Sequence, residues 1–247
     1  MATTVPVASP AAEPSARKRA ERRFFSGYMI AIAAVIFVGF APSFFLRGIV
    51  PSAPLPPLRE TAIIHGVMAT ALVLIFPLQA SLIAYGKRDL HIRLGQVGFV
   101  VAALMIPVIY VIGAFAYHRQ EASIPPFAVA GLSLLILPLY TLALALAWRF
   151  RFDAQSHKRL MILVALLLSS AAVVRLPIWN HPLSSTLAWI AMIVPLWLWD
   201  MTATRRIHRM TLFSTAALIF QGAVNALVLP SMAWQDLVKV IPGYGIP

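Results

Sequence analysis

The stretch TAIIHGVMATALVLIFPLQASLIAY, residues Thr61–Tyr85, decides the fold class. It contains no Asp, Glu, Lys or Arg, and a helix needs about 20 mostly apolar residues to cross a bilayer. The stretch therefore predicts a membrane-spanning helix. A histidine inside a span is rare and usually faces a partner or a site, so His65 is the most informative residue in it.

The composition of the whole chain gives the same class. Hydrophobic residues make up 60% of the 247 residues and charged residues 11%, whereas a soluble domain has roughly 25% charged residues. Such a chain cannot cover itself with a solvated surface, so it is expected to be an integral membrane protein. The absence of cysteine excludes disulfides, iron–sulfur clusters and thiolate zinc sites.

Six further stretches have the same character, and the seven predicted spans form an all-α, polytopic membrane bundle over residues 24–230. Their bounds are Phe24–Leu46, Thr61–Tyr85, Gly95–Tyr117, Pro126–Trp148, Leu160–Trp179, Leu183–Met201 and Thr211–Pro230. Residues 1–23 are expected to form a disordered basic cytoplasmic tail, and residues 231–247 a short tail at the outer face. Prolines inside or late in spans predict kinks at Pro42, Pro77, Pro107, Pro138 and Pro195.

The Lys and Arg residues predict the orientation of the bundle. With a cytoplasmic N-terminus, 15 of the 20 fall on the cytoplasmic side, as the positive-inside rule requires. They are Arg17, Lys18, Arg19, Arg22, Arg23, Lys87, Arg88, Arg93, Arg149, Arg151, Lys158, Arg159, Arg205, Arg206 and Arg209; the others are Arg47, Arg59, Arg119, Arg175 and Lys239. We expect a protein of the bacterial inner membrane with its C-terminus outside. Its net charge of +12 then reflects orientation and anionic lipid headgroups, not nucleic acid.

A His-x-Arg-Leu string occurs twice, at His91–Leu94 and at His157–Leu160, each time where a predicted span begins on the cytoplasmic side. Asp89 and Ser156 stand just before these strings and can cap the helix ends. The two preceding hairpins have the same orientation, which suggests a parallel internal repeat. The strings therefore mark equivalent ends of two helices.

The chemistry of these helix starts leaves two interpretations open. The helix dipole and the neighbouring cations favour neutral imidazoles, and a neutral imidazole can bind a metal or accept a proton. Alternatively, the cations Arg93, Lys158 and Arg159 and the free backbone N–H groups bind a lipid phosphate.

Two longer runs, HGVMATALVLIFPLQASLIAYGKRDLHIRLGQVG and SHKRLMILVALLLSSAAVVRL, carry a resemblance over residues 60–176. They resemble a family of uncharacterised bacterial multipass membrane proteins with a His-Gly, a Gln, a His-x-Arg-x-Gly, a His-(Lys/Arg)-x-x-Met and a distal Arg. The matching positions are His65, Gly66, Gln79, His91, Arg93, Gly95, His157, Lys158, Met161 and Arg175. The bundle of this family looks like that of b-type cytochromes, which implies haem b and electron transfer with a quinone or a redox partner protein.

The positions of the histidines limit where a haem iron could be held. His65, His118 and His181 lie toward the outer face, and His91, His157 and His208 toward the inner face. Because a 20-residue span is about 30 Å long, an outer and an inner histidine cannot share one iron. His91 with His157 is the inner candidate pair for haem iron, and His65 with His118 or His181 is the outer one. The chain departs from di-haem cytochromes, since no helix carries two ligands about four turns apart.

If the chain is an electron carrier, it would be an electron-transfer component of the oxidoreductase type. A second, non-enzymatic class of function also stays open. Because His65 and Arg175 share the outer half, they can bind an anionic ligand between their helices. The chain would then be a non-enzymatic membrane protein that binds lipid or a hydrophobic ligand, or an accessory subunit of a membrane complex. A transporter is the third interpretation. Kinked helices favour it, whereas the lack of a chain of acidic residues within the membrane argues against it.

Overall fold

The computed structural model describes residues 16–50, 57–118, 126–178 and 181–244, and the elements within these ranges are helices. They are α1 (Ala16–Phe40), the π-helical turn η1 (Ala41–Phe45), α2 (Glu60–Ala84), α3 (Arg88–His118), α4 (Pro126–Leu134), α5 (Leu137–Arg149), α6 (Ala154–Val173), α7 (Pro182–Ala191), α8 (Val194–Trp199), the π-helical turn η2 (Asp200–Thr204), α9 (Arg209–Leu227) and α10 (Met232–Val238). The first 15 residues of the predicted tail, Arg119 and Trp179 lie outside the described residues.

Within the described residues, seven helical segments are long and apolar enough to cross a membrane, one for each predicted span, which confirms the all-α, seven-span fold class. Three of them begin six or more residues earlier than predicted, and one of the three is the fifth, which begins at Ala154 and not at Leu160. The first begins at Ala16, so the described part of the predicted tail is helical, because Ala, Arg, Lys and Glu all favour a helix. The third begins at Arg88, which puts His91 and Arg93 inside its first turns.

Of the five prolines where kinks were predicted, three lie at a π-helical turn or beside an interruption of the helix, and two lie inside continuous helices. Pro42 lies in η1, Pro138 follows the interruption between α4 and α5, and Pro195 follows the one between α7 and α8. Pro77 and Pro107 lie inside helices that continue through them. A proline removes one backbone donor, and the tertiary surroundings decide whether the helix tolerates the loss.

The interruption between α7 and α8 has a partner on another helix. The N–H of Leu196 bonds to the carbonyl of Ile193, so the helix tightens there. In a regular α-helix that N–H would bond to the carbonyl of Met192, which therefore needs another donor. The hydroxyl of Tyr28, on α1, donates to the carbonyl oxygen of Met192. A contact between distant helices thus supports the break.

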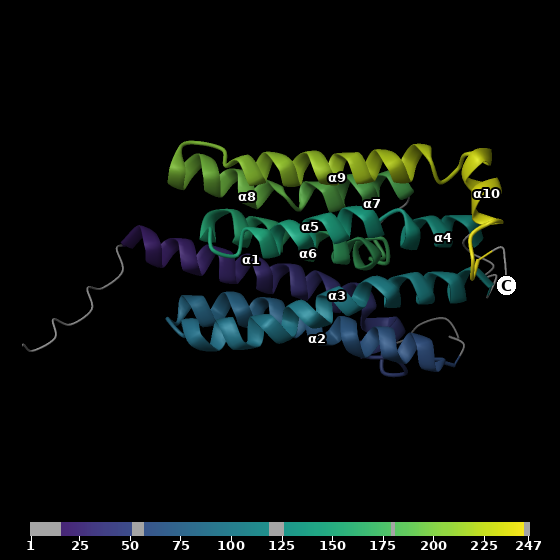
Figure 1. Ribbon diagram of the computed structural model, residues 1–247, viewed down its shortest axis with the longest axis horizontal. Helices are drawn as coiled ribbons and strands as arrows, with labels where there is room; N and C mark the ends of the chain where they lie inside the picture. Colours follow the sequence, from purple (N-terminus) through teal and green to yellow (C-terminus); the bar gives the residue numbers. More distant parts are fainter. Residues whose placement is uncertain (1–15, 51–56, 119–125, 179–180, 245–247) are drawn as a thin grey trace, which may run out of the picture.

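The helices lie side by side along the long axis of the molecule, and α10 crosses one end of the bundle (Figure 1). Two antiparallel hairpins, α2–α3 and α5–α6, are joined by α1, which packs against both α2 and α6. On its other side α6 packs against α7 and α9. Helix α6 is accordingly the centre of the core. In its most apolar stretch 67% of the residues are buried, against 33% or less in the same stretch of every other described span.

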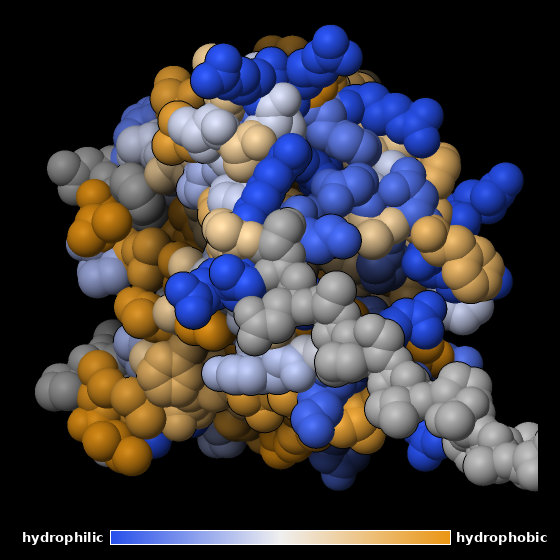
Figure 2. Space-filling model, turned by 90° about the vertical axis from the view of Figure 1, so that its left-hand side faces the viewer, coloured by the Kyte–Doolittle hydropathy of each residue, from blue (hydrophilic) through white to orange (hydrophobic). Residues whose placement is uncertain are grey.

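The two ends of the bundle differ in character. We call the end with residues 16–23, 85–88, 149–159 and 205–209 the basic end, and Figure 2 shows hydrophilic residues gathered over it with hydrophobic residues at its edges. At the opposite end, α10 packs against α4, with Trp234 and Val238 buried. Tyr244 donates to the carbonyl of Tyr110 at 2.9 Å, so the chain folds back onto α3 after α10.

Candidate functional site

The histidines of both strings bond to the helix that precedes their own. His157 Nδ1 donates to the carbonyl oxygen of Ala147 on α5 at 2.9 Å, and His91 Nδ1 contacts Gln79 on α2. Each imidazole therefore ties the start of one helix to the end of its hairpin partner. The two rings lie close enough for the charge of one to act on the other.

The two imidazoles differ in the nitrogen that they leave for a ligand. At His157 the carbonyl requires a proton on Nδ1, so the lone pair of Nε2 is available to a metal. At His91 the amide of Gln79 satisfies its neighbours when its nitrogen faces the ring, donating to Nδ1 at 2.6 Å, while its oxygen accepts from the N–H of Gly95 at 3.0 Å. That bond puts the proton on Nε2. The Nε2 of His157 is therefore available to an iron, whereas that of His91 carries the proton, so this pair does not fit a bis-histidine haem.

A buried ion pair, which the sequence did not predict, lies near the basic end. Arg159 on α6 donates through Nη2 to Asp200 Oδ1 of η2, and their side chains are 1% and 0% exposed. The Nε of Arg159 donates to Thr211 Oγ1 on α9 at 3.2 Å, and its Nη1 donates to Gln155 Oε1 at 2.8 Å. The other carboxylate oxygen of Asp200 accepts from Thr211 Oγ1 at 2.6 Å and from the N–H of His208 at 2.9 Å. We call these residues the Arg159 network.

The three cations predicted to bind lipid phosphate lie in different surroundings. Arg93 is exposed on α3. Lys158 pairs with Glu21 and lies over the ring of Phe25, 4.2 Å from its centre. Arg159 is buried, and its guanidinium bonds to Asp200, Thr211 and Gln155.

The residue that caps α6 is Asp153, three residues before the predicted cap, Ser156. Asp153 caps this helix: its Oδ1 accepts from the N–H of Gln155 at 3.0 Å, and its Oδ2 accepts from the hydroxyl of Ser156 at 2.6 Å. Ser156 is therefore a donor to the cap. The hydrogen bonds from Ser156 and Gln155 hold the pKa of Asp153 below its usual range.

His208 gives the basic end a pH dependence that can be measured. Burial, followed by the charge of Arg159, lowers its pKa, and its neutral Nδ1 caps α9 by accepting from the N–H of Met210 at 3.1 Å. Because the unfolded chain binds this proton first, stability is complete above the unfolded pKa of about 6.5 and falls as the pH drops toward the folded pKa. Asn caps a helix without titrating. We expect the Tm of the wild type to fall relative to that of His208→Asn between pH 7 and 5; a constant difference would contradict this.

At the opposite end, a second polar cluster lies between α2 and the end of α6. Thr61 and His65 are one turn apart on one face of α2, and Thr61 Oγ1 and His65 Nδ1 are both buried without a hydrogen-bond partner. Arg175 lies close enough for its charge to act on His65. It donates to the carbonyl of Ala171 at 2.6 Å and lies over the ring of Phe40, 4.8 Å from its centre. We call Thr61, His65 and Arg175 the polar site.

The polar site is notable because buried polar atoms are nearly always hydrogen-bonded. In the described part of the chain, three buried side-chain atoms have no partner, and two of them belong to the polar site; the third is Gln221 Oε1. Leaving such an atom unpaired costs about 1–3 kcal/mol. A ligand that hydrogen-bonds to Thr61 and His65 would remove that cost.

The other histidines at this end serve local structure. His118 Nε2 lies 3.1 Å from the carbonyl oxygen of Gly243, and His181 caps α7 by accepting from the N–H of Leu183 at 3.1 Å. Gly66 leaves no open space for a flat ligand beside His65, because a Cβ there would lie 2.2 Å from the ring of Phe44. The small residue lets η1 pack against α2.

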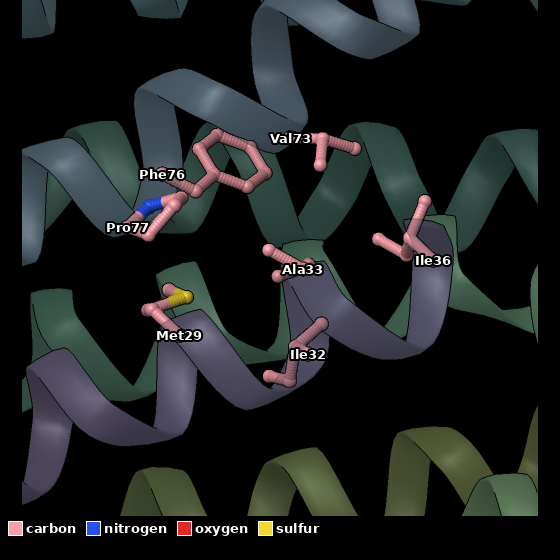
Figure 3. Close-up of a pocket in the computed structure, with 8 residues that line it drawn as sticks. Met29, Ile32, Ala33, Ile36, Val73, Phe76 and Pro77 are labelled. Atoms are coloured by element: carbon pink, nitrogen blue, oxygen red, sulfur yellow. The ribbon is translucent and has the colours of Figure 1, made fainter. Parts of the chain in front are cut away.

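An apolar groove lies between α1 and α2, with Ala165 of α6 also in its lining, and Figure 3 shows the side chains that line it. The lining residues are Met29, Ile32, Ala33, Ile36, Val73, Phe76, Pro77 and Ala165. Ala33, Val73 and Pro77 are half-buried, and the other five are buried.

Comparisons of the chain with protein-family models, with curated proteins and with solved structures find no match. Within the described residues, no group of three or more His, Asp or Glu side chains is placed to hold a metal ion. The candidate sites therefore rest on the geometry of this chain.

Proposed function

We propose that the chain is a non-enzymatic protein of the bacterial inner membrane that binds an anionic amphiphile, such as a phospholipid, at the polar site. The observation that supports this most is the pair of buried, unpartnered atoms Thr61 Oγ1 and His65 Nδ1. Arg175 adds a positive charge near them. Together these groups offer an anionic headgroup both hydrogen bonds and charge.

The proposal explains why polar groups lie at this depth. Thr61 and His65 lie on α2, one of the helices apolar enough to cross a membrane, and polar groups inside a bilayer are expensive unless they serve a partner. With the predicted orientation the polar site lies in the outer half of the bilayer, so a lipid of the outer leaflet can reach it. A phosphate or carboxylate accepts hydrogen bonds from Thr61 and His65 and pairs with arginine.

Native mass spectrometry of the detergent-purified protein, titrated with phosphatidylglycerol or phosphatidylcholine, tests the proposal. We expect the wild type to retain phosphatidylglycerol preferentially. Arg175→Gln should lower its apparent affinity about 10- to 100-fold, because a hydrogen bond to a charged group contributes about 1.5–3 kcal/mol. The control Lys239→Gln removes the same charge from an exposed residue at the same end and should retain the lipid.

A second variant separates binding from folding. Thr61→Val removes a buried hydroxyl that has no partner, so the lipid-free protein should be at least as stable as the wild type. The same variant should bind phosphatidylglycerol more weakly. Equal retention of both lipids by the wild type, or unchanged affinity in Arg175→Gln and Thr61→Val, would contradict the proposal.

A b-type haem at the basic end is the second candidate function. The available Nε2 of His157 favours it, with this histidine as the protein's one ligand to the iron, because the bond from Gln79 keeps the proton of His91 on Nε2. A haem bound there would supply a one-electron couple. The predicted result is a reduced b-type absorption band under dithionite that His157→Ala abolishes and His181→Ala, at the other end, leaves intact. Colourless protein from haem-replete cells would exclude this candidate.

A further inference from the structure

We propose that the π-helical turn η1 is the gate of the polar site, and that the ring of Phe44 moves away from α2 when an anionic headgroup enters or leaves. This inference rests on the proposed function and adds to it the way in which the ligand reaches the site. The observation behind it is that one short stretch of chain, from Phe40 to Phe44, contacts both sides of the polar site.

Two aromatic rings make these contacts. Arg175 Cζ, just beyond the end of α6, lies 4.8 Å from the centre of the Phe40 ring. Four residues after Phe40, the ring of Phe44 fills the place of a side chain on Gly66, since a Cβ there would lie 2.2 Å from it. Gly66 follows His65 directly on α2. The stretch therefore bridges the two elements between which the polar site lies.

The polar site is closed in this arrangement. Thr61 and His65 are half-buried residues, yet Thr61 Oγ1 and His65 Nδ1 are themselves buried, so neighbouring atoms cover them. A phosphate or carboxylate must touch these atoms to bond to them, and a covered polar atom without a partner is unfavourable. At least one neighbouring element must therefore move before a headgroup can bind there.

The construction of η1 allows it to move. None of its five residues is buried, and Pro42 supplies no backbone donor. The N–H of Leu46 bonds to the carbonyl of Ala41 at 2.7 Å, which closes a π-helical turn, and such turns are uncommon and often mark functional sites. Gly39, just before η1, lies against the backbone of α6, and Gly48, just after it, has a φ of 79°, which glycine adopts without strain. The turn thus has a fixed start and a permissive end.

Lipid exchange on the full-length, detergent-purified protein tests the gate. The protein is loaded with deuterated phosphatidylglycerol, mixed with an excess of the unlabelled lipid, and followed over time by native mass spectrometry. Phe44→Ala removes the ring, and Gly66→Ala pushes it away from α2, so each variant should exchange lipid about tenfold faster than the wild type. The preference for phosphatidylglycerol over phosphatidylcholine should stay, because Thr61, His65 and Arg175 are unchanged.

Matched variants show whether the effect belongs to this one contact. Phe37→Ala removes an exposed ring of α1, and Gly27→Ala adds a methyl group that meets nothing within 4 Å; both should exchange at the wild-type rate. The double variant Phe44→Ala/Gly66→Ala should be no faster than either single variant, because both substitutions break the same contact. Wild-type exchange rates in Phe44→Ala and Gly66→Ala, with the preference for phosphatidylglycerol retained, would overturn the gate and leave the proposed function standing. A wild type with no preference for anionic lipid would overturn both.

A reversible cross-link tests the same contact in the opposite direction. The chain has no cysteine of its own, so a bis-methanethiosulfonate reagent can join η1 to α2 in the variant Phe44→Cys/Gly66→Cys alone. The cross-linked protein should exchange lipid about tenfold more slowly than the same protein after reduction, because the gate is held shut. Equal rates before and after reduction would show that η1 does not control entry.

Discussion

Asp200→Ala is expected to lower the free energy of unfolding by about 3–5 kcal/mol, the largest effect predicted for this chain. The substitution leaves the guanidinium of Arg159 buried with no carboxylate, and Thr211 and His208 lose an acceptor at the same time. Removing one partner of a buried pair costs more than the pair itself contributes, because the remaining charge is uncompensated. Thermal unfolding of the detergent-purified protein, followed by tryptophan fluorescence, measures the loss.

Two controls identify the cause of this loss. The double variant Arg159→Met/Asp200→Leu removes both charges and should recover most of the lost stability. Arg209→Gln breaks an exposed pair with Asp153, whose atoms lie 3.9 Å apart, and should change stability by about 1 kcal/mol or less. A double variant less stable than Asp200→Ala would show that the network acts through something other than charge compensation.

Gly39→Ala should destabilise the protein by about 1–3 kcal/mol, because α1 and α6 touch backbone to backbone there. A Cβ at Gly39 would lie 2.3 Å from the carbonyl oxygen of Ala172 and 2.8 Å from its Cα. These atoms belong to the main chain of the most buried helix and cannot turn aside. The two helices must separate, which weakens the junction between the hairpins.

The same helix offers a control of opposite sign. A Cβ at Gly27 meets nothing within 4 Å, so Gly27→Ala should stabilise the protein by about 0.5–1 kcal/mol through reduced backbone entropy of the unfolded chain. Chemical or thermal unfolding of both variants, under the same conditions, gives the two values. Equal effects from Gly39→Ala and Gly27→Ala would mean that close approach of α1 and α6 is unimportant.

The fold class could be predicted because the bilayer imposes one strong condition on sequence. A span needs a long apolar run, and each predicted run has a helical counterpart. Where the helices begin was less predictable. The residues at the start of α1 are charged, which hydropathy counts against a span, yet they favour a helix and continue α1 toward the basic end.

Tertiary partners were harder to predict, because spacing along the chain does not show which helices are neighbours. Asp200 stands close in sequence to Arg205 and Arg206, yet its partner is Arg159, 41 residues earlier. Gln221 and Asn225 stand one turn apart on α9, and Gln221 donates to Asn225 at 3.0 Å within this helix. A signal for the Arg159 network did exist, since an acidic residue at the end of an apolar run needs a partner.

The polar site was predictable only in part. His65 and Arg175 could be assigned to the same half of the bundle by counting residues, and the sequence placed a candidate anionic ligand there. The contribution of Thr61 could not be foreseen, because a threonine near a helix start usually bonds to nearby backbone. Its hydroxyl becomes informative only when the structure shows it buried without such a bond.

The central place of α6 has a consequence for the order in which the protein is made. Arg159 enters the bilayer with α6, whereas Asp200 and Thr211 are synthesised 41 and 52 residues later. During synthesis the first five spans therefore hold a cation whose counter-charge has not yet left the ribosome. The bundle cannot mature from its N-terminus onward: its most buried helix stays incomplete until the last two spans are inserted beside it.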